Sequence, residues 1–288
     1  MDGGLSSKVP PSLTALYARA AATTPLHRGG GDLPDSVYEL TPQPIDPGHV
    51  ADYARVCGFR YGDVLPPTYL HVLAFGLQVA LMSERGFPFP LVGLVHVANS
   101  FTVHRPVTVD EQVSFTVRAA NLRPHVAGTQ LDLLSEGAVD GQGVWSGRST
   151  YLRRGGRPPG RPAGPKPGNA LEPPAGAVSQ VRVPADIGRR YAAVSGDRNP
   201  IHLSALSAKL FGFPSAIAHG MWLKARTLAA LEGRLPERYT VEVSFKTPVL
   251  LPTTVAIGTD RTGDGWTLDV RNARSGKPHL AGTVSGGA

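Results

Sequence analysis

The chain has 288 residues, a formal net charge of +7, a hydrophobic content of 41% and a mean hydropathy of −0.08. These values are typical of a soluble globular protein that buries a sizeable core, as one large domain or two of ordinary size. The single cysteine, Cys57, excludes an internal disulfide bond and a cysteine-based zinc site.

The N-terminal residues predict no secretory signal, because residues 1–25 lack an uninterrupted apolar core after a basic segment. No later run reaches the roughly 18 apolar residues that a membrane-spanning helix needs. Together with the single cysteine, which suits a reducing compartment, this predicts a soluble protein without a membrane span, located in the cytoplasm.

The first half of the chain, residues 1–152, predicts two helices followed by strands. A short helix ends near YARVCG, residues 53–58, and a longer apolar helix follows Pro67 in PTYLHVLAFGLQVALM. Alternating apolar and polar residues then predict strands in VHVANSFTV, from Pro106 to Val113, in EQVSFTVRAANL and in GVWSGRSTYLR. This order indicates an α+β unit in which a helix packs on an antiparallel sheet.

Residues 153–177 are interpreted as an exposed linker between two domains. The segment RRGGRPPGRPAGPKPGNALEPPAGA is dense in proline and glycine, so it cannot hold a periodic helix or strand. It also carries part of the positive charge, which we interpret as that of a solubilising linker, with a nucleic-acid tail as the alternative. The net charge of the whole chain suits a phosphate-bearing acyl carrier as well as a nucleic acid. Because aromatic residues make up only 7% of the chain, a platform for stacking bases is not indicated and we expect no nucleic-acid partner.

The second half, residues 178–288, repeats the patterns of the first in the same order. YAAVSG at residues 191–196 matches YARVCG, and Pro214 opens another apolar helical run, PSAIAHGMWLKARTLAAL. The earlier strands then have counterparts in YTVEVSF, in a strand from Pro248 to Val255, in TVAIGTDRT and in GWTLDVRNA. Several short patterns that recur in one order predict a duplicated α+β unit.

The two halves differ in the length of one segment. The shared glycine and the shared proline are nine positions apart in the first half (58 to 67) and eighteen in the second (196 to 214). The first half therefore lacks nine residues, in the region that holds GDRNPIH in the second half. This asymmetry predicts one working centre, in the second half, supported by the first.

The segment GDRNPIH combines an acid, an amide and an imidazole at a helix start. Asn199 can cap the helix, Pro200 suits its first position, and His202 falls in the first turn. Asp197 and His202 can then reach one bound water from the same side of a short loop, an arrangement that moves protons. The alternative is structural, with a turn-forming aspartate and a half-buried histidine.

A second candidate lies in AIAHGMWLKA, residues 216–225. Gly220 in the opening turn of a buried helix leaves free N–H groups that can hold an oxyanion, although it can equally serve close packing. His202, His219 and Asp197 match no zinc motif such as H-E-x-x-H. Motifs of serine hydrolases, dinucleotide sites and nucleotide sites are also missing, so we expect no metal and no cofactor.

These residues resemble the signature of the MaoC-like, (R)-specific enoyl-CoA hydratases, also called type 2 enoyl-CoA hydratases. The resemblance rests on YAAVSGDRNPIHLSALSA followed by AIAHGM, and it covers the second half closely. The first half is similar to the degenerate half of double hotdog members. The resemblance implies an α+β double hotdog fold, in which two antiparallel sheets, each wrapped round a long helix, pair into one continuous sheet. Residues 1–152 would support the acyl pocket, and residues 178–288 would be the catalytic hotdog.

The resemblance also implies a site and a reaction. Asp197 and His202 would hold and activate water, and the Gly220 N–H would donate to the thioester oxygen. Supporting residues would be Asn199, Ser195, Gly196 and His219. The enzyme would reversibly hydrate trans-2-enoyl thioesters of coenzyme A or acyl carrier protein in fatty acid metabolism, without a cofactor, as a monomeric pseudo-dimer or a homodimer.

Two other functions stay open at this point. A hotdog thioesterase would use similar residues to direct water at the carbonyl carbon, and it would release thiol. A non-catalytic acyl-binding subunit would need neither Asp197 nor His202, so their substitution would leave its function unchanged.

Overall fold

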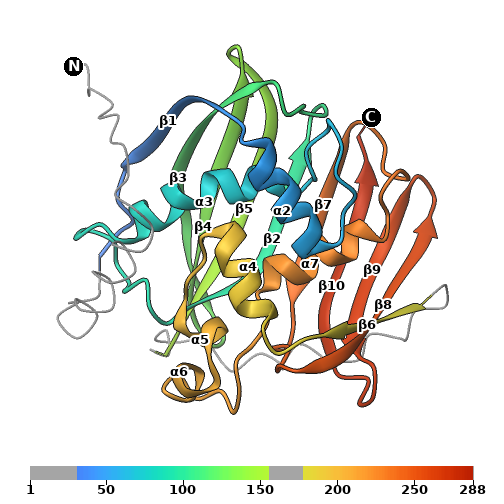
Figure 1. Cartoon of the computed structure of the whole chain (residues 1–288). Coiled ribbons are helices and arrows are strands. Elements are labelled where there is room, and N and C mark those ends of the chain that lie inside the picture. Colours follow the sequence, from blue (N-terminus) through green and yellow to red (C-terminus); the bar gives the residue numbers. More distant parts are fainter. Residues whose placement is uncertain (1–30, 156–177, 288) are drawn as a thin grey trace.

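A computed structural model of the chain describes residues 31–155 and 178–287. Ten strands of these residues form one sheet in the order β1-β3-β4-β5-β2-β7-β10-β9-β8-β6. All neighbouring strands are antiparallel. Figure 1 shows this curved sheet with the larger helices lying across one of its faces.

The sheet consists of five strands from each half of the chain. The strands of the first half are β1 (Val37–Pro44), β2 (Leu94–Val103), β3 (Gln112–His125), β4 (Gly128–Val139) and β5 (Gln142–Arg154). Those of the second half are β6 (Val178–Val183), β7 (Tyr239–Phe245), β8 (Thr253–Thr262), β9 (Gly265–Asn272) and β10 (Pro278–Gly286). Because β2 pairs with β7, the two halves join into one continuous sheet, as the resemblance implied.

The helices also follow the duplicated pattern. The short helices that end at the matching hexapeptides are α2 (Pro47–Cys57) and α4 (Ile187–Ser195), and glycines in the left-handed conformation terminate both. The longer apolar runs contain α3 (Tyr69–Met82) and α7 (Gly220–Ala229). The predicted α+β architecture, in which each half packs a helix against its own strands, is confirmed.

Helix α7 is shorter than the predicted apolar run, because it begins at Gly220 and not at Pro214. The preceding residues are extended, since the Ala218 N–H donates to the Val249 carbonyl at 2.9 Å and Ile217 forms a bridge with Leu250. These backbone bonds hold residues 216–218 against another segment and delay the helix. The strand predicted from Pro248 accordingly begins only at Thr253.

The first half shows the same deviation at the equivalent place. The strand predicted from Pro106 begins at Gln112, because the preceding residues pair with a loop. There the Leu65 N–H donates to the Val107 carbonyl at 2.9 Å, and Val64 forms a bridge with Thr108. The sequence patterns did not predict β1, β4, β6 or β10 as separate strands.

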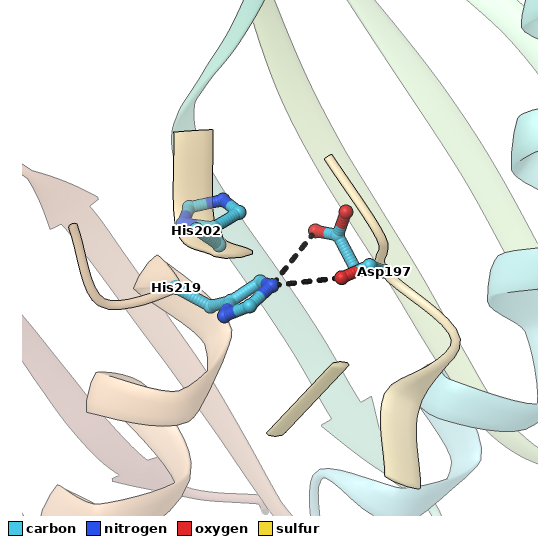
Figure 2. Close-up of side chains that lie close together, drawn as sticks. All are labelled: Asp197, His202 and His219. Atoms are coloured by element: carbon cyan, nitrogen blue, oxygen red, sulfur yellow. Dashed lines mark hydrogen bonds and ion pairs between the residues drawn. The ribbon is translucent and has the colours of Figure 1, made fainter. Parts of the chain in front are cut away.

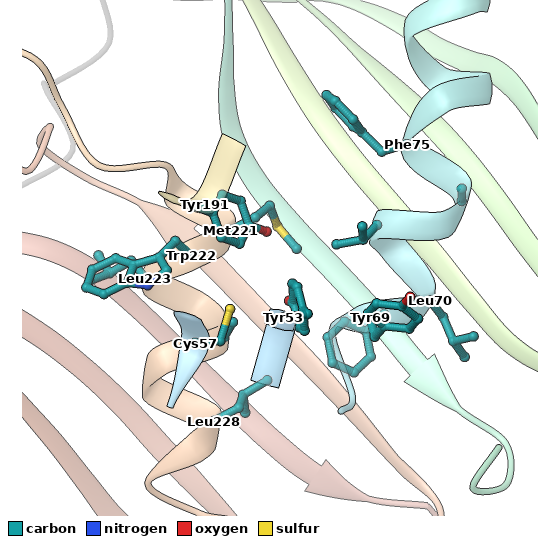
Figure 3. Close-up of a cluster of buried hydrophobic side chains, with 14 of the residues drawn as sticks. Tyr53, Cys57, Tyr69, Leu70, Phe75, Tyr191, Met221, Trp222, Leu223 and Leu228 are labelled. Atoms are coloured by element: carbon teal, nitrogen blue, oxygen red, sulfur yellow. The ribbon is translucent and has the colours of Figure 1, made fainter. Parts of the chain in front are cut away.

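The helices of the two halves meet in a shared apolar core. Figure 3 shows Tyr53 of α2, Tyr191 of α4 and Trp222 of α7 in one buried cluster. The rings of Tyr53 and Tyr191 lie 6.2 Å apart, and the Trp222 indole N–H donates to the Val56 carbonyl at 3.0 Å. Because this packing joins the halves, the first half helps to position the segment that carries the candidate site.

The predicted division into domains depends on residues that the structure describes only in part. Arg153 and Arg154 of the predicted linker belong to the end of β5, and residues 156–177 lie outside the described residues. The boundaries at 152 and 178 therefore stay a prediction. No helix within residues 31–155 and 178–287 has the length and apolar content needed to cross a membrane.

Candidate active site

The extra segment of the second half folds into a loop between α4 and α7 that carries two short helices. These are α5 (Pro200–Leu203) and α6 (Ala205–Lys209), which lie beside α4 at one edge of the molecule (Figure 1). Gly196 ends α4 with a φ of 74°, and the Asn199 side chain then caps α5 by accepting from the Ile201 N–H at 3.4 Å. The predicted cap and the predicted helix start are confirmed.

A glycine of α4 permits the loop to approach this closely. A Cβ atom placed on Gly188 would lie 2.0 Å from the carbonyl oxygen of His202. The backbone of α5 therefore packs directly against the backbone of α4, and only glycine fits at that contact. Sequence reasoning missed Gly188, because its effect depends on a segment fourteen positions away.

Asp197 is held in a tight turn with its carboxylate partly exposed. Its Oδ1 accepts from the Asn199 N–H at 3.2 Å, and its own N–H donates to the Ser195 hydroxyl at 3.2 Å. The side chain is 26% exposed, whereas Ser195 is buried. The predicted supporting residues Ser195, Gly196 and Asn199 therefore do surround Asp197, and they set the direction of its carboxylate.

His202 and His219 form a stacked pair beside this carboxylate (Figure 2). Their ring centroids lie 3.6 Å apart with an interplanar angle of 25°. Nδ1 of His202 lies 2.8 Å from the Ile217 carbonyl, and Nε2 of His219 lies 2.9 Å from the Asp197 carbonyl and 3.8 Å from Asp197 Oδ2. A carbonyl only accepts, so these two nitrogens carry the protons and Nε2 of His202 keeps a lone pair.

Burial keeps both imidazoles neutral. Burial, together with the neighbouring His202, lowers the pKa of His219 to about 3, although the Asp197 charge and the hydrogen bond to the Asp197 carbonyl oppose the shift. Burial also lowers the pKa of His202, against the charge of Asp197 and the hydrogen bond to Ile217. At neutral pH His202 therefore offers an unprotonated Nε2 beside a carboxylate.

The spacing of these groups suits one bridging water. Single ligand atoms of Asp197, His202 and His219 all lie within 4.8 Å of one another. Two acceptors that share a water through hydrogen bonds of about 2.8 Å lie about 4.5 Å apart at the tetrahedral angle. A water between the Asp197 carboxylate and Nε2 of His202 would donate both of its hydrogens and leave a lone pair for attack on an electrophile.

The same three side chains are poorly arranged for a metal ion. An imidazole binds a metal in the plane of its ring, at about 2.0–2.1 Å for zinc. The planes of His202 and His219 are nearly parallel and 3.6 Å apart between centroids, so their nitrogen lone pairs do not converge on one point. Two of the four ring nitrogens also donate to carbonyl oxygens.

Gly220 opens α7 immediately after His219. His219 is the N-cap residue, and in the described part of the chain the Gly220 N–H meets no acceptor. This N–H lies at the positive end of the helix, next to the histidine that contacts Asp197. A Cβ at Gly220 would lie 3.0 Å from the ring of Phe245, so glycine also allows that ring to pack here. Both explanations considered for Gly220 from the sequence are compatible with the geometry.

Sequence reasoning also missed polar residues that the first half brings near this loop. Burial lowers the pKa of His71 and His96 and raises that of Tyr151, and the charge of Asp197 acts on all three. They come from α3, β2 and β5, so no local motif joins them. The available signal was two histidines in otherwise apolar segments, LHVLAF and LVHVAN.

Comparisons with known families match both halves of the chain. Residues 165–281 match the MaoC like domain, and residues 37–136 match the FAS1-like dehydratase domain region. The 3-hydroxyacyl-thioester dehydratase X of Mycobacterium tuberculosis is 40% identical over 278 residues, which cover 96% of this chain and 99% of that protein.

Solved structures give the same relationship. A crystal structure of HtdX from M. tuberculosis has a TM-score of 0.77 and 39% identity, covering 87% of this chain and 99% of that chain. Another M. tuberculosis protein, described as having a double hotdog fold, has a TM-score of 0.54 and 13% identity, covering 86% and 94%. The second likeness concerns the fold alone, and it confirms the predicted double hotdog arrangement.

Proposed function

The chain belongs to the MaoC-like dehydratase family, and we propose that it catalyses the reversible, (R)-specific hydration of trans-2-enoyl thioesters. In the opposite direction it would dehydrate (R)-3-hydroxyacyl thioesters, and the M. tuberculosis relative is named a 3-hydroxyacyl-thioester dehydratase. One observation carries the proposal. The Asp197 carboxylate and a ring nitrogen of His202 lie within the span of one water, beside the N–H that opens α7. Nε2 is the His202 nitrogen left unprotonated, because Nδ1 donates to the Ile217 carbonyl.

The first step is the attack of this water on C3 of the enoyl group. Asp197 and His202 accept its two hydrogens, so the oxygen lone pair is directed at the substrate. As the C3–O bond forms, one proton passes to the pair and the π electrons of C2=C3 move towards the thioester carbonyl. General-base catalysis of this kind contributes about 10²–10⁴-fold to the rate.

The second step depends on Gly220. The negative charge that develops on the thioester oxygen would be stabilised by the Gly220 N–H at the positive end of α7. A single such donor typically contributes about 10²–10³ to kcat in a site that excludes water. The proton held by the Asp197–His202 pair would then pass to C2, which completes the addition of water and restores both groups.

His219 would act on the reaction through Asp197. Its Nε2 donates to the Asp197 carbonyl and lies 3.8 Å from the carboxylate, while its ring stacks on His202. It would therefore keep the two catalytic side chains at a constant separation. Ser195, Gly196 and Asn199 would support the same geometry from the other side of the turn.

The substrate would be a thioester of coenzyme A or of acyl carrier protein, used in fatty acid metabolism. The net charge of +7 suits the phosphate of either carrier. The cytoplasmic location and the assembly as a monomeric pseudo-dimer or a homodimer stay predictions.

Hydration of crotonyl-CoA, followed by the loss of enoyl absorbance, tests the proposal. We expect Asp197→Asn and His202→Gln each to lower kcat by about 10²–10⁴-fold, because each removes one acceptor of the attacking water. Asp110→Asn and His104→Gln make the same exchanges at exposed positions outside the site and should retain full activity.

The assay also separates the alternative functions. A thioesterase would release free thiol without consuming the enoyl group, and that result would reject the hydratase. A non-catalytic acyl-binding subunit would show no turnover. Near-wild-type rates in both site variants would instead reject the assignment of Asp197 and His202.

A further inference from the structure

His96 of β2 occupies the centre of an aromatic cluster to which both halves of the chain contribute. Its ring stacks on Tyr151 at a centroid distance of 4.7 Å and an interplanar angle of 16°, and it meets Phe245 edge to face at 5.2 Å and 68°. His71 of α3 lies 6.2 Å away in a parallel orientation. This cluster thus contains two histidine rings that the proposed mechanism does not use.

The cluster adjoins the candidate active site. The ring of Phe245 contacts His96 on one side, and on another it lies 3.0 Å from the position of a Cβ on Gly220. Phe245 therefore contacts both His96 and the residue whose N–H is proposed to bind the thioester oxygen. The charge of Asp197 also reaches His96, where it opposes the effect of burial on the pKa.

The backbone of β2 is irregular at this residue. The pairing of β2 with β5 shifts register between His96 and Ala98, so one extra residue is inserted in β2. Such β-bulges frequently occur next to active sites, where they change the direction of a side chain. The bulge thus singles out the position of His96 in an otherwise regular pair of strands.

One nitrogen of His96 has no partner among the described residues. Its Nε2 is buried without a hydrogen bond, although the backbone of Ala98 forms a hydrogen bond with the ring. Burial, helped by the charge of Lys224, lowers the pKa of His96 to about 4, so the ring is neutral at pH 7. A buried polar atom without a partner is costly and uncommon in native proteins, and a ligand that donates a hydrogen bond to it would remove that cost.

We propose that His96 is a substrate contact supplied by the first half, whose Nε2 accepts a hydrogen bond from the bound acyl thioester when the Phe245 ring is displaced. The inference rests on the proposed function, because it takes the thioester to lie at Gly220. The donor is an amide N–H of the carrier arm, because in the proposed mechanism the 3-hydroxyl group of the (R)-3-hydroxyacyl chain is held by Asp197 and His202.

His96→Phe tests this contact, since it keeps the ring and its stacking but removes both nitrogens. We expect a loss of about tenfold in kcat/KM, typical of one missing hydrogen bond to a ligand. The melting temperature should stay equal or rise, because the variant no longer buries an unpartnered nitrogen. A merely structural role would instead lower the melting temperature of the variant and leave its kcat/KM unchanged.

His279→Phe is the matched control. His279 is also buried with an unpartnered Nε2, and its Nδ1 lies 2.9 Å from the Thr247 carbonyl. Because it is not part of the cluster around His96, we expect unchanged KM values for both substrates. Tyr151→Phe, which keeps the stacked ring beside His96, serves as a second control on packing.

The two directions of the reaction identify the donor. An amide of the carrier arm predicts a raised KM for both crotonyl-CoA and (R)-3-hydroxybutyryl-CoA in His96→Phe, together with weaker equilibrium binding of saturated butyryl-CoA. A raised KM for the hydroxyacyl thioester alone would contradict the amide contact, since only that substrate carries the 3-hydroxyl group. Unchanged KM values in both directions and unchanged butyryl-CoA binding would overturn the proposal. The binding measurement needs no turnover, so it separates failure of this contact from failure of the proposed function.

Discussion

Replacement of Gly188 by alanine tests whether close backbone packing positions the catalytic loop. In α4 this glycine faces α5, and an added Cβ would lie 2.0 Å from the His202 carbonyl oxygen and 3.0 Å from the carbonyl carbon. The atoms in the way belong to the backbone, so no side-chain rotation can relieve the overlap. The α4–α5 contact must open.

The size of the movement follows from this distance. Contacts of a Cβ below 3.0 Å are essentially never observed, so the 2.0 Å approach requires a shift of at least about 1 Å at His202. A misplacement of about 1 Å can lower the rate by about 10²-fold. Alanine also favours the helix by about 1 kcal/mol, while the overpacking costs about 1–3 kcal/mol. We therefore expect a large loss of activity with a modest loss of stability.

Hydration kinetics and thermal unfolding of Gly188→Ala measure both effects. Gly86→Ala is the control, because a Cβ there meets nothing within 4 Å and its φ is not positive. We expect wild-type kinetics for Gly86→Ala and about 10²-fold lower kcat/KM for Gly188→Ala. A Gly188→Ala protein with wild-type kcat/KM and a raised melting temperature would refute the reasoning. The higher helix propensity of alanine would then explain the whole effect of the substitution.

Three further predictions concern protonation, the oxyanion donor and the buried cation. Burial is the main cause that lowers the pKa values of His71, His96 and His219, to about 3, 4 and 3 respectively. Below pH 6.5 the unfolded chain therefore binds more protons than the folded protein. We expect the free energy of unfolding to fall as the pH falls from 6.5 towards 4. Each histidine contributes about 1.4 kcal/mol per pH unit, and equal urea midpoints at pH 7 and pH 5 would contradict this. Gly220→Pro removes the N–H at a helix position where proline is tolerated, whereas Gly220→Ala keeps it. We expect kcat of the proline variant to be about 10²–10³-fold lower than that of the alanine variant. Equal kcat values would show that the Gly220 N–H does not stabilise the oxyanion. Lys224 is fully buried with its ammonium on three oxygen acceptors, so Lys224→Met should cost about 1–3 kcal/mol in urea unfolding, and an unchanged midpoint would show that these bonds contribute nothing.

The fold and family could be predicted from local sequence, because they depend on patterns that neighbouring residues complete. The alternation in VHVANSFTV and YTVEVSF corresponds to β2 and β7, and the apolar runs correspond to α3 and α7. The order of these patterns revealed the duplication, and the comparisons confirm the family and its hydro-lyase class. The extra nine residues of the second half, where GDRNPIH lies, likewise indicated which half carries the candidate site.

Part of the candidate site was predictable for the same reason. Asn199, Pro200 and His202 are close in sequence, so their cap and first turn follow from local preferences. Gly220 was predicted to lie in the opening turn of a buried helix, although the apolar helical run was expected to begin at Pro214. The catalytic roles of Asp197 and His202 stay predictions until the variants are measured.

Only the tertiary structure decided the chemical state of the site. The proton position on His202 depends on the Ile217 carbonyl, and the link between His219 and Asp197 spans twenty-two positions. The approach allowed by Gly188 and the cluster around His96 bring together segments from different helices and strands. Local propensities specify which helices and strands form. The burial and hydrogen bonds that set the protonation of the histidines and the distances between the site residues arise only when distant segments pack together.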